Sequence, residues 1–202
     1  MSTQAIVSIY TEATPNPDTM KFVLNRMLFP QKSADFPTLE EARMASPLAA
    51  TIFENFDFVN GVFIMNNFVT VTKKTDLEWF EIIPDLREFI RNYISNGGEI
   101  IDEQLLHENL SENSSIGANA IGENDSEVVI KIKELLAKYV QPAVEMDGGT
   151  IVFRDFQDGI VTLGMQGSCS GCPSSTVTLK SGIEGLMKRM IPEVQSVEAE
   201  AL

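Results

Sequence analysis

Both cysteines of the chain lie in one short stretch, Gly167-Ser168-Cys169-Ser170-Gly171-Cys172-Pro173. Two thiols at this CxxC spacing can ligate a soft metal centre or cycle between a dithiol and a disulfide. The two glycines leave room for a bulky group to approach the backbone. Pro173 suits the first turn of a helix, whose positive end would favour a thiolate at Cys172. The pattern therefore predicts two reactive thiols in a loop, away from apolar core positions.

Four interpretations of this motif compete. A structural zinc site takes four protein ligands, and this chain offers two cysteines and one distant histidine, His107. A thioredoxin-type oxidoreductase would place its CxxC after a central strand of a larger sheet, whereas this motif follows a predicted hairpin. An iron–sulfur centre held by two copies of the chain would obtain four thiolates through twofold symmetry. The Gly/Ser setting argues against the fourth interpretation, an incidental cysteine pair.

Composition and charge narrow the class of protein. A length of 202 residues with 44% hydrophobic residues suits two modest globular domains. No apolar run approaches the roughly 20 residues of a membrane span, and the first ten residues do not resemble a signal peptide. A net charge of −14 argues against nucleic acid as a partner. Two cysteines without an export signal predict a reducing compartment, the cytoplasm, or the mitochondrial matrix if a leader has been removed.

The negative charge is concentrated in the middle of the chain. Residues 96–124 carry a net charge of −6 with no basic residue, whereas residues 1–95 and 125–202 carry −4 each. This central segment is rich in Asn, Ser, Gly and Glu, so it has little apolar surface to bury. We therefore predict a flexible acidic linker at 96–124, with a short helix around 100–110. We assign no role to His107 within it.

The first half predicts a small α+β domain at 1–95. Alternating residues indicate strands at 7–10 and 21–24, and two more strands flank Asn66-Asn67 as a hairpin at 62–65 and 68–72. Ser46 and Pro47 fit the N-cap and first position of a helix. Pro84 is expected to open the last helix of this domain. No titratable cluster or phosphate-binding loop is visible in this half.

The second half, 125–202, predicts the order α-β-β-α-β. Asn124 or Asp125 is the expected N-cap of a helix whose apolar face includes Tyr139, and Pro142 is expected to close it or to follow its end. A turn at 157–159 joins two strands of a hairpin, 150–153 and 160–165. The CxxC follows, then a helix that begins at Pro173 and a last strand at 194–199. The predicted fold class is α+β, with two small α/β-layer domains.

Several motifs together make a family resemblance specific. The CxxC stretch and the residues around it resemble the C-terminal domain of the NifU-like (Nfu) iron–sulfur carriers. The residues that carry this likeness are Gly167–Ser175, Thr178-Leu179-Lys180, Gly182-Ile183-Glu184, Asp147-Gly148-Gly149 and Ile191-Pro192-Glu193-Val194. The first half is similar to the N-terminal domain of many Nfu proteins, through Thr14-Pro15-Asn16-Pro17, Lys21-Phe22, Ser46–Ala49, Gly61-Val62 and Phe68–Lys73.

The resemblance implies a carrier that is not an enzyme. Such a protein would bind a 4Fe–4S cluster between two protomers through Cys169 and Cys172, and deliver it to apo-proteins. Its partners would be a second copy of the chain, upstream assembly proteins and apo iron–sulfur proteins, with the first domain as a recognition module. A dithiol–disulfide oxidoreductase or redox chaperone that uses the same thiols is the alternative. Two departures from the family pattern are Thr150, where an acidic residue is frequent, and Gln141, where Arg is common.

Overall fold

The computed structural model describes residues 6–74, 77–105, 119, 121–122, 124–170 and 173–201. The chain forms two compact units, Met1–Ser114 and Ser115–Leu202, and each unit combines helices with strands. This confirms the predicted α+β class. Within the described residues, no helix has both the length and the apolar character needed to cross a membrane.

The first unit is built on a five-stranded antiparallel sheet. Its strands are β1 (Ile9–Ala13), β2 (Thr19–Leu24), β3 (Phe29–Phe36), β4 (Val59–Asn66) and β5 (Phe68–Lys73), in the spatial order β1-β2-β5-β4-β3. The β4–β5 hairpin turns at Asn66, whose φ of 46° is the positive value that the Asn pair predicts. Edge strand β3 was not expected from the sequence.

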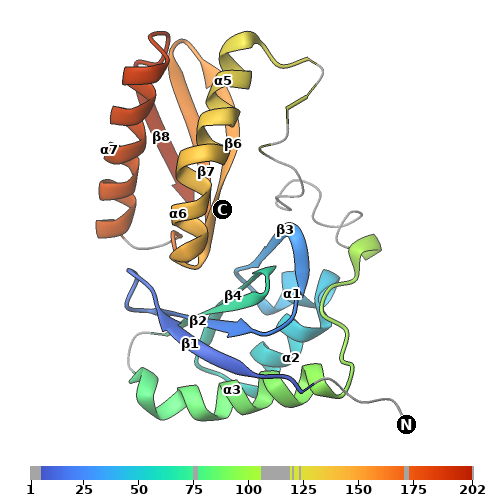
Figure 1. Ribbon diagram of the computed structural model, residues 1–202. Coiled ribbons are helices and arrows are strands. Elements are labelled where there is room, and N and C mark those ends of the chain that lie inside the picture. The colour runs from blue at the N-terminus through green and yellow to red at the C-terminus, as the bar shows by residue number, and fades with distance from the viewer. Residues whose placement is uncertain are drawn as a thin grey trace. The chain divides into compact units, whose positions relative to one another are not determined.

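Helices α1 (Leu39–Ala45), α2 (Pro47–Asn55) and α3 (Trp79–Ser95) pack with this sheet (Figure 1). Helix α2 begins as predicted, because the Ser46 hydroxyl accepts a hydrogen bond from the Ala49 N–H at 3.1 Å and Pro47 is the first helical residue. The expectation that Pro84 opens the last helix is wrong. Helix α3 begins at Trp79, because a buried stripe that starts at Ile82 continues past the proline.

The core of the first unit lies between its sheet and its helices. Large, fully buried side chains come from both layers, and they are Phe22, Phe36, Leu24, Leu48, Ile52, Ile64, Leu86 and Ile90. Phe63 is also fully buried, but it belongs to a separate small cluster with Val23, Met65 and Phe68. The indole N–H of Trp79 donates to the Pro17 carbonyl at 2.8 Å and so attaches the start of α3 to the loop before β2.

Part of the predicted linker packs on the first unit. The Ser46 hydroxyl donates to the Ile100 carbonyl at 2.6 Å, the Asp102 N–H donates to the Ala45 carbonyl at 2.8 Å, and Lys32 pairs with Glu103. A boundary at residue 95 therefore omits contacts that belong to this unit. Residues 103–105 are helical, whereas His107 and the rest of the expected helix lie outside the described residues.

The second unit has two layers, a three-stranded sheet and a layer of helices on one of its faces (Figure 1). Strands β6 (Gly149–Gln157) and β7 (Ile160–Gly167) form the predicted hairpin, turning at Asp158 and Gly159 with φ of 51° and 81°. Helix α7 (Pro173–Met190) follows β7 and begins at Pro173 as predicted. Strand β8 (Ser196–Ala201) then pairs parallel with β7.

The helical segment before this sheet differs from the prediction. It runs through α5 (Glu127–Leu135), a π-helical turn η1 (Leu136–Val140) and α6 (Gln141–Met146). Its N-cap is Ser126, whose hydroxyl accepts from the Val129 N–H, so Asn124 and Asp125 were wrong candidates. Asp125 instead pairs with the buried Lys133 ammonium at 2.8 Å. Pro142 neither closes the segment nor follows its end, because it lies within α6, which continues to Met146.

The π-helical turn explains one wrong core assignment. A π turn contains more residues than an α turn and so rotates every later side chain around the axis. Val140 and Val144 become buried, while Tyr139, predicted for the apolar stripe, is 50% exposed. The core of this unit joins this segment to the sheet and to α7 through a cluster that includes Ile132, Leu136, Leu163, Met165, Ile183 and Met187.

Candidate metal centre

The loop that bears Cys169 begins with a sharp turn at the end of β7. Gly167 has a φ of 66°, a left-handed conformation that a residue with a side chain rarely adopts. The Ser170 N–H donates to the Gly167 carbonyl at 3.0 Å and closes the turn. The chain therefore reverses immediately after the strand and directs Cys169 back toward the sheet.

Ser168 fastens this loop to the turn that precedes β6. Its N–H donates to the Gly148 carbonyl at 3.3 Å, and its hydroxyl donates to the Asp147 carbonyl. Its Oγ also lies 3.9 Å from the Cys169 Sγ. Ser168 and Asp147 are 21 residues apart in the sequence, so these bonds join the Asp147-Gly148-Gly149 turn and the cysteine loop into one local structure.

Gly149 forms the surface against which Cys169 packs. A Cβ added at this position would lie 2.6 Å from the Gln166 carbonyl oxygen, 2.8 Å from the Cys169 Sγ and 3.2 Å from the Cys169 nitrogen. Gly149 pairs with Gly167 across the β6–β7 ladder, so both strands lack a side chain where the cysteine loop crosses them. This close approach requires glycine at position 149.

Cys169 is a core residue in this structure. It is 5% exposed and belongs to the apolar cluster of the second unit. Burial raises the pKa of its thiol to about 11; the nearby Ser168 hydroxyl acts in the opposite direction, and the Asp147 charge adds to the rise. The expectation that both cysteines lie away from the core is therefore wrong for Cys169, because the turn at Gly167 folds it inward.

The second thiol cannot be placed beside the first. Cys172 and Gly171 lie outside the described residues, although α7 starts at Pro173, the next position in the chain. Among the residues that the structure does describe, no group of three or more His, Cys, Asp or Glu side chains is arranged to hold a metal ion. The described part of the site therefore supplies one thiol, a ligand type that suits soft metals and iron–sulfur clusters.

The two departures from the family pattern contact each other. The Gln141 amide donates from Nε2 to the Thr150 hydroxyl at 2.7 Å and to the Glu145 carboxylate at 2.9 Å. The Gln141 Oε1 is buried without a hydrogen-bond partner among the described residues. The contact between Gln141 and Thr150 thus joins α6 to β6 at the residue that follows Gly149. Sequence reasoning found both positions but not their contact.

Ser168 and Gly149 are the residues that sequence reasoning overlooked as parts of the site. Both lie in motifs already noted for the family resemblance, yet nothing in either motif alone shows that they touch. A signal was available, because the predicted hairpin of β6 and β7 places the residues just before one strand beside those just after the other.

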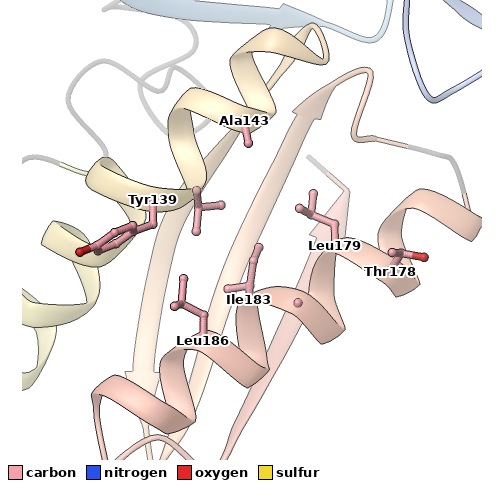
Figure 2. A pocket seen from close by; sticks show the side chains of 8 residues that line it. Tyr139, Ala143, Thr178, Leu179, Ile183 and Leu186 are labelled. Carbon is pink, nitrogen blue, oxygen red and sulfur yellow. The ribbon is translucent and has the colours of Figure 1, made fainter.

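A groove runs between α7 and the helices that precede the sheet (Figure 2). Its volume is about 300 Å³, and its lining is almost entirely apolar: Tyr139, Val140, Ala143, Thr178, Leu179, Gly182, Ile183 and Leu186. Tyr139 and Val140 are consecutive, and both reach the groove at the π-helical turn.

Comparison with known protein families finds one match in each half of the chain. A family described as "Scaffold protein Nfu/NifU N terminal" matches residues 9–97, and a family described as "NifU-like domain" matches residues 132–198. Together these matches cover more than half of the chain.

Relatives of known name carry the same family names. The chain is 39% identical over 191 residues to the human "NFU1 iron-sulfur cluster scaffold homolog, mitochondrial", covering 94% of this chain and 70% of that protein. It is 42% identical over 194 residues to "NifU-like protein 4, mitochondrial" of Arabidopsis thaliana, covering 95% of this chain and 65% of that protein. The chain thus spans about two thirds of their lengths.

Among solved structures, the solution NMR structure of a NifU-like protein from Saccharomyces cerevisiae matches at 27% identity with a TM-score of 0.45. It covers 51% of this chain and 91% of that one. The two family matches, and the 39% identity to the human protein over 70% of its length, establish that this chain belongs to the NifU-like (Nfu) family, with an Nfu N-terminal domain and a NifU-like domain.

Proposed function

We propose that the protein is an iron–sulfur cluster carrier that binds a 4Fe–4S cluster between two protomers and delivers it to apo-proteins. Cys169 and Cys172 are the proposed ligands from each chain. The observation that carries this proposal is the site at the end of β7, where glycines at 149 and 167 bring a cysteine loop against a tight turn. Since the chain has two cysteines, four thiolates require a second copy.

The burial of Cys169 fits a carrier whose thiol is unreactive when no cluster is bound. A thiol with a pKa of about 11 is neutral at physiological pH, so it neither ligates metal nor reacts with oxidants readily. Ligation requires the loop to turn outward and the thiol to lose its proton. Release to an acceptor would return the sulfur to its place beside Gly149, which favours unloading once acceptor thiolates compete for the cluster.

The same burial weighs against the oxidoreductase alternative. Thiol–disulfide exchange needs a thiolate that can reach the substrate disulfide. Cys169 meets neither condition in this conformation, so Cys172 would have to be the attacking group. We therefore propose a protein that carries its cluster and is not an enzyme.

The two domains have separate proposed roles. We assign cluster binding to residues 125–202 and partner recognition to the N-terminal domain, residues 1–95. Residues 96–124 are the proposed linker, and the first residues of this linker pack on the N-terminal domain. The proposed partners are upstream cluster-assembly proteins and apo iron–sulfur proteins. The matched relatives are named mitochondrial, which supports the mitochondrial alternative and not the cytoplasmic expectation.

Anaerobic reconstitution with iron and sulfide tests the cluster proposal. Wild-type protein should hold about four iron and four sulfide per two chains, with the absorption of a 4Fe–4S cluster and the mass of a dimer. Cys169→Ser and Cys172→Ser should each abolish stable binding while circular dichroism stays unchanged. A complete cluster held by a monomer without added thiol would contradict the proposal.

A transfer assay separates the carrier from the oxidoreductase. Loaded protein should activate an apo iron–sulfur enzyme at a rate that rises with acceptor concentration, and an iron chelator should not intercept the transfer. Efficient disulfide turnover by the metal-free protein, together with failure to activate any acceptor, would favour the alternative.

A further inference from the structure

The groove beside α7 is an apolar surface that the second unit leaves open. Leu179, Ile183 and Leu186 project into it from α7, and Ala143 points toward them from the opposite wall, whereas the Tyr139 ring points away from α7 (Figure 2). At its centre Gly182 has no atom within 4 Å of where a Cβ would lie, so the floor of the groove is wide there. An open apolar groove of this kind on a small domain marks an interaction surface.

The groove lies close to the cysteine loop. Helix α7 begins at Pro173, directly after the CxxC, and at about 1.5 Å per residue Leu179 is only about 9 Å along the helix axis from that start. On the opposite wall, α6 ends at Met146, next to the Asp147-Gly148-Gly149 turn to which the loop is bonded. Both walls therefore end at the candidate cluster site.

One exposed side chain completes the surface. Met146 is 76% exposed and lies three residues after Ala143, so it continues the same face of α6 toward the cysteine loop. Methionine is flexible and adapts to irregular apolar surfaces. The domain thus presents a projecting apolar side chain and an apolar groove on one face, as a self-complementary twofold interface requires.

We propose that the occupant of this groove is a second copy of the chain, with Met146 of each protomer inserted into the groove of its partner. This inference rests on the proposed cluster-sharing function, which is incomplete without the second copy because each chain has two thiols. It adds the surface that holds the protomers together. A volume of about 300 Å³ suits one or two side chains and not a whole helix, which also favours a single projecting methionine.

Gly182→Leu is the decisive variant, and Gly185→Leu is its matched control. Neither glycine has an atom within 4 Å of its added Cβ, both lie in α7, and both changes raise helix propensity. Only Gly182 lines the groove. Gly182→Leu should raise the dissociation constant of the cluster-loaded dimer about tenfold or more, equivalent to about 1.4 kcal/mol, as measured by sedimentation on dilution. Gly185→Leu should leave it within about twofold of wild type.

A second pair tests the projecting side chain. Met146→Ser should weaken the loaded dimer in the same way, whereas Met190→Ser, at the other end of α7 and 55% exposed, should not. Both methionines are exposed, so neither substitution removes a core contact. Circular dichroism of the metal-free proteins checks that all four variants fold.

The outcomes separate this inference from the proposed function. If wild-type protein forms no cluster-bridged dimer, the proposed function fails. If wild type forms it and Gly182→Leu dissociates like Gly185→Leu, the groove is not the dimer surface and this inference is overturned. The inference is also overturned if Gly182→Leu leaves the dimer intact but slows cluster transfer, since the occupant is then an acceptor protein.

Discussion

Replacement of Gly149 by alanine tests whether this position must be glycine for the cysteine loop to close. The added Cβ would lie 2.6 Å from the Gln166 carbonyl oxygen and 2.8 Å from the Cys169 Sγ. The carbonyl belongs to a paired strand and can move little, whereas the sulfur can rotate outward. Overpacking of this kind costs about 1–3 kcal/mol, and alanine recovers about 0.5–1 kcal/mol of strand entropy. The net loss of stability should be about 1–2 kcal/mol.

Calorimetry and alkylation together measure both consequences. For a domain of this size, that loss lowers the melting temperature of the second unit by about 5–15 °C. In a Cys172→Ser background, alkylation of Cys169 should become faster, because the displaced sulfur is exposed. Gly182→Ala is the control, since its Cβ meets no atom within 4 Å and alanine stabilises a helix.

Two results would refute this reasoning. One is a Gly149→Ala protein whose second unit melts within a degree or two of wild type. The other is a destabilised protein whose Cys169 is alkylated at the wild-type rate, which would mean that the loop does not pack on Gly149.

Three further predictions concern individual residues. Ser168→Ala removes the bond to the Asp147 carbonyl, worth about 1 kcal/mol, so alkylation of Cys169 should become about fivefold faster; an unchanged rate would show that the bond does not hold the loop closed. The pKa of the Cys169 thiol is about 11 in the folded protein and about 8.5 in the unfolded chain, so the unfolded chain loses this proton first as the pH rises. Relative to Cys169→Ser, metal-free wild type should therefore lose up to about 1.4 kcal/mol of stability per pH unit between about pH 9 and 11. Ser46→Ala should destabilise the first unit by about 1–2 kcal/mol and speed amide exchange at Asp102, because Ser46 both caps α2 and bonds Ile100; normal protection at Asp102 would argue against this contact.

Local chemistry made much of this fold predictable from sequence. Asn66 and the Asp158-Gly159 pair take the positive φ values that their residue types tolerate, so both hairpins were placed correctly. Ser46 and Pro47 mark the start of α2 because a side-chain cap and a fixed φ act within one turn. The two thiols were proposed as the candidate site from their spacing, their Gly/Ser setting and the family motifs around them.

The features that sequence reasoning missed depend on tertiary packing. Strand β3 contains Pro30 and several polar residues, a pattern tolerated because β3 lies at the sheet edge. The π-helical turn places Tyr139 outward, although a regular helix of period 3.6 would bury it. Cys169 is buried because the loop folds onto Gly149, and neither motif alone contains that information.

Trp79 is positioned to act as an intrinsic fluorescent probe of the distance between the two units. Trp79 is the only tryptophan of this sequence, and it is fixed in the first unit by its bond to the Pro17 carbonyl and by the Lys73 ammonium 5.8 Å from the ring centroid. The proposed cluster ligands belong to the second unit. Since iron–sulfur clusters absorb light in the range where tryptophan emits, cluster loading should quench this emission by resonance energy transfer. The residual intensity would then report the separation of the two units while a cluster is being delivered, without an added label.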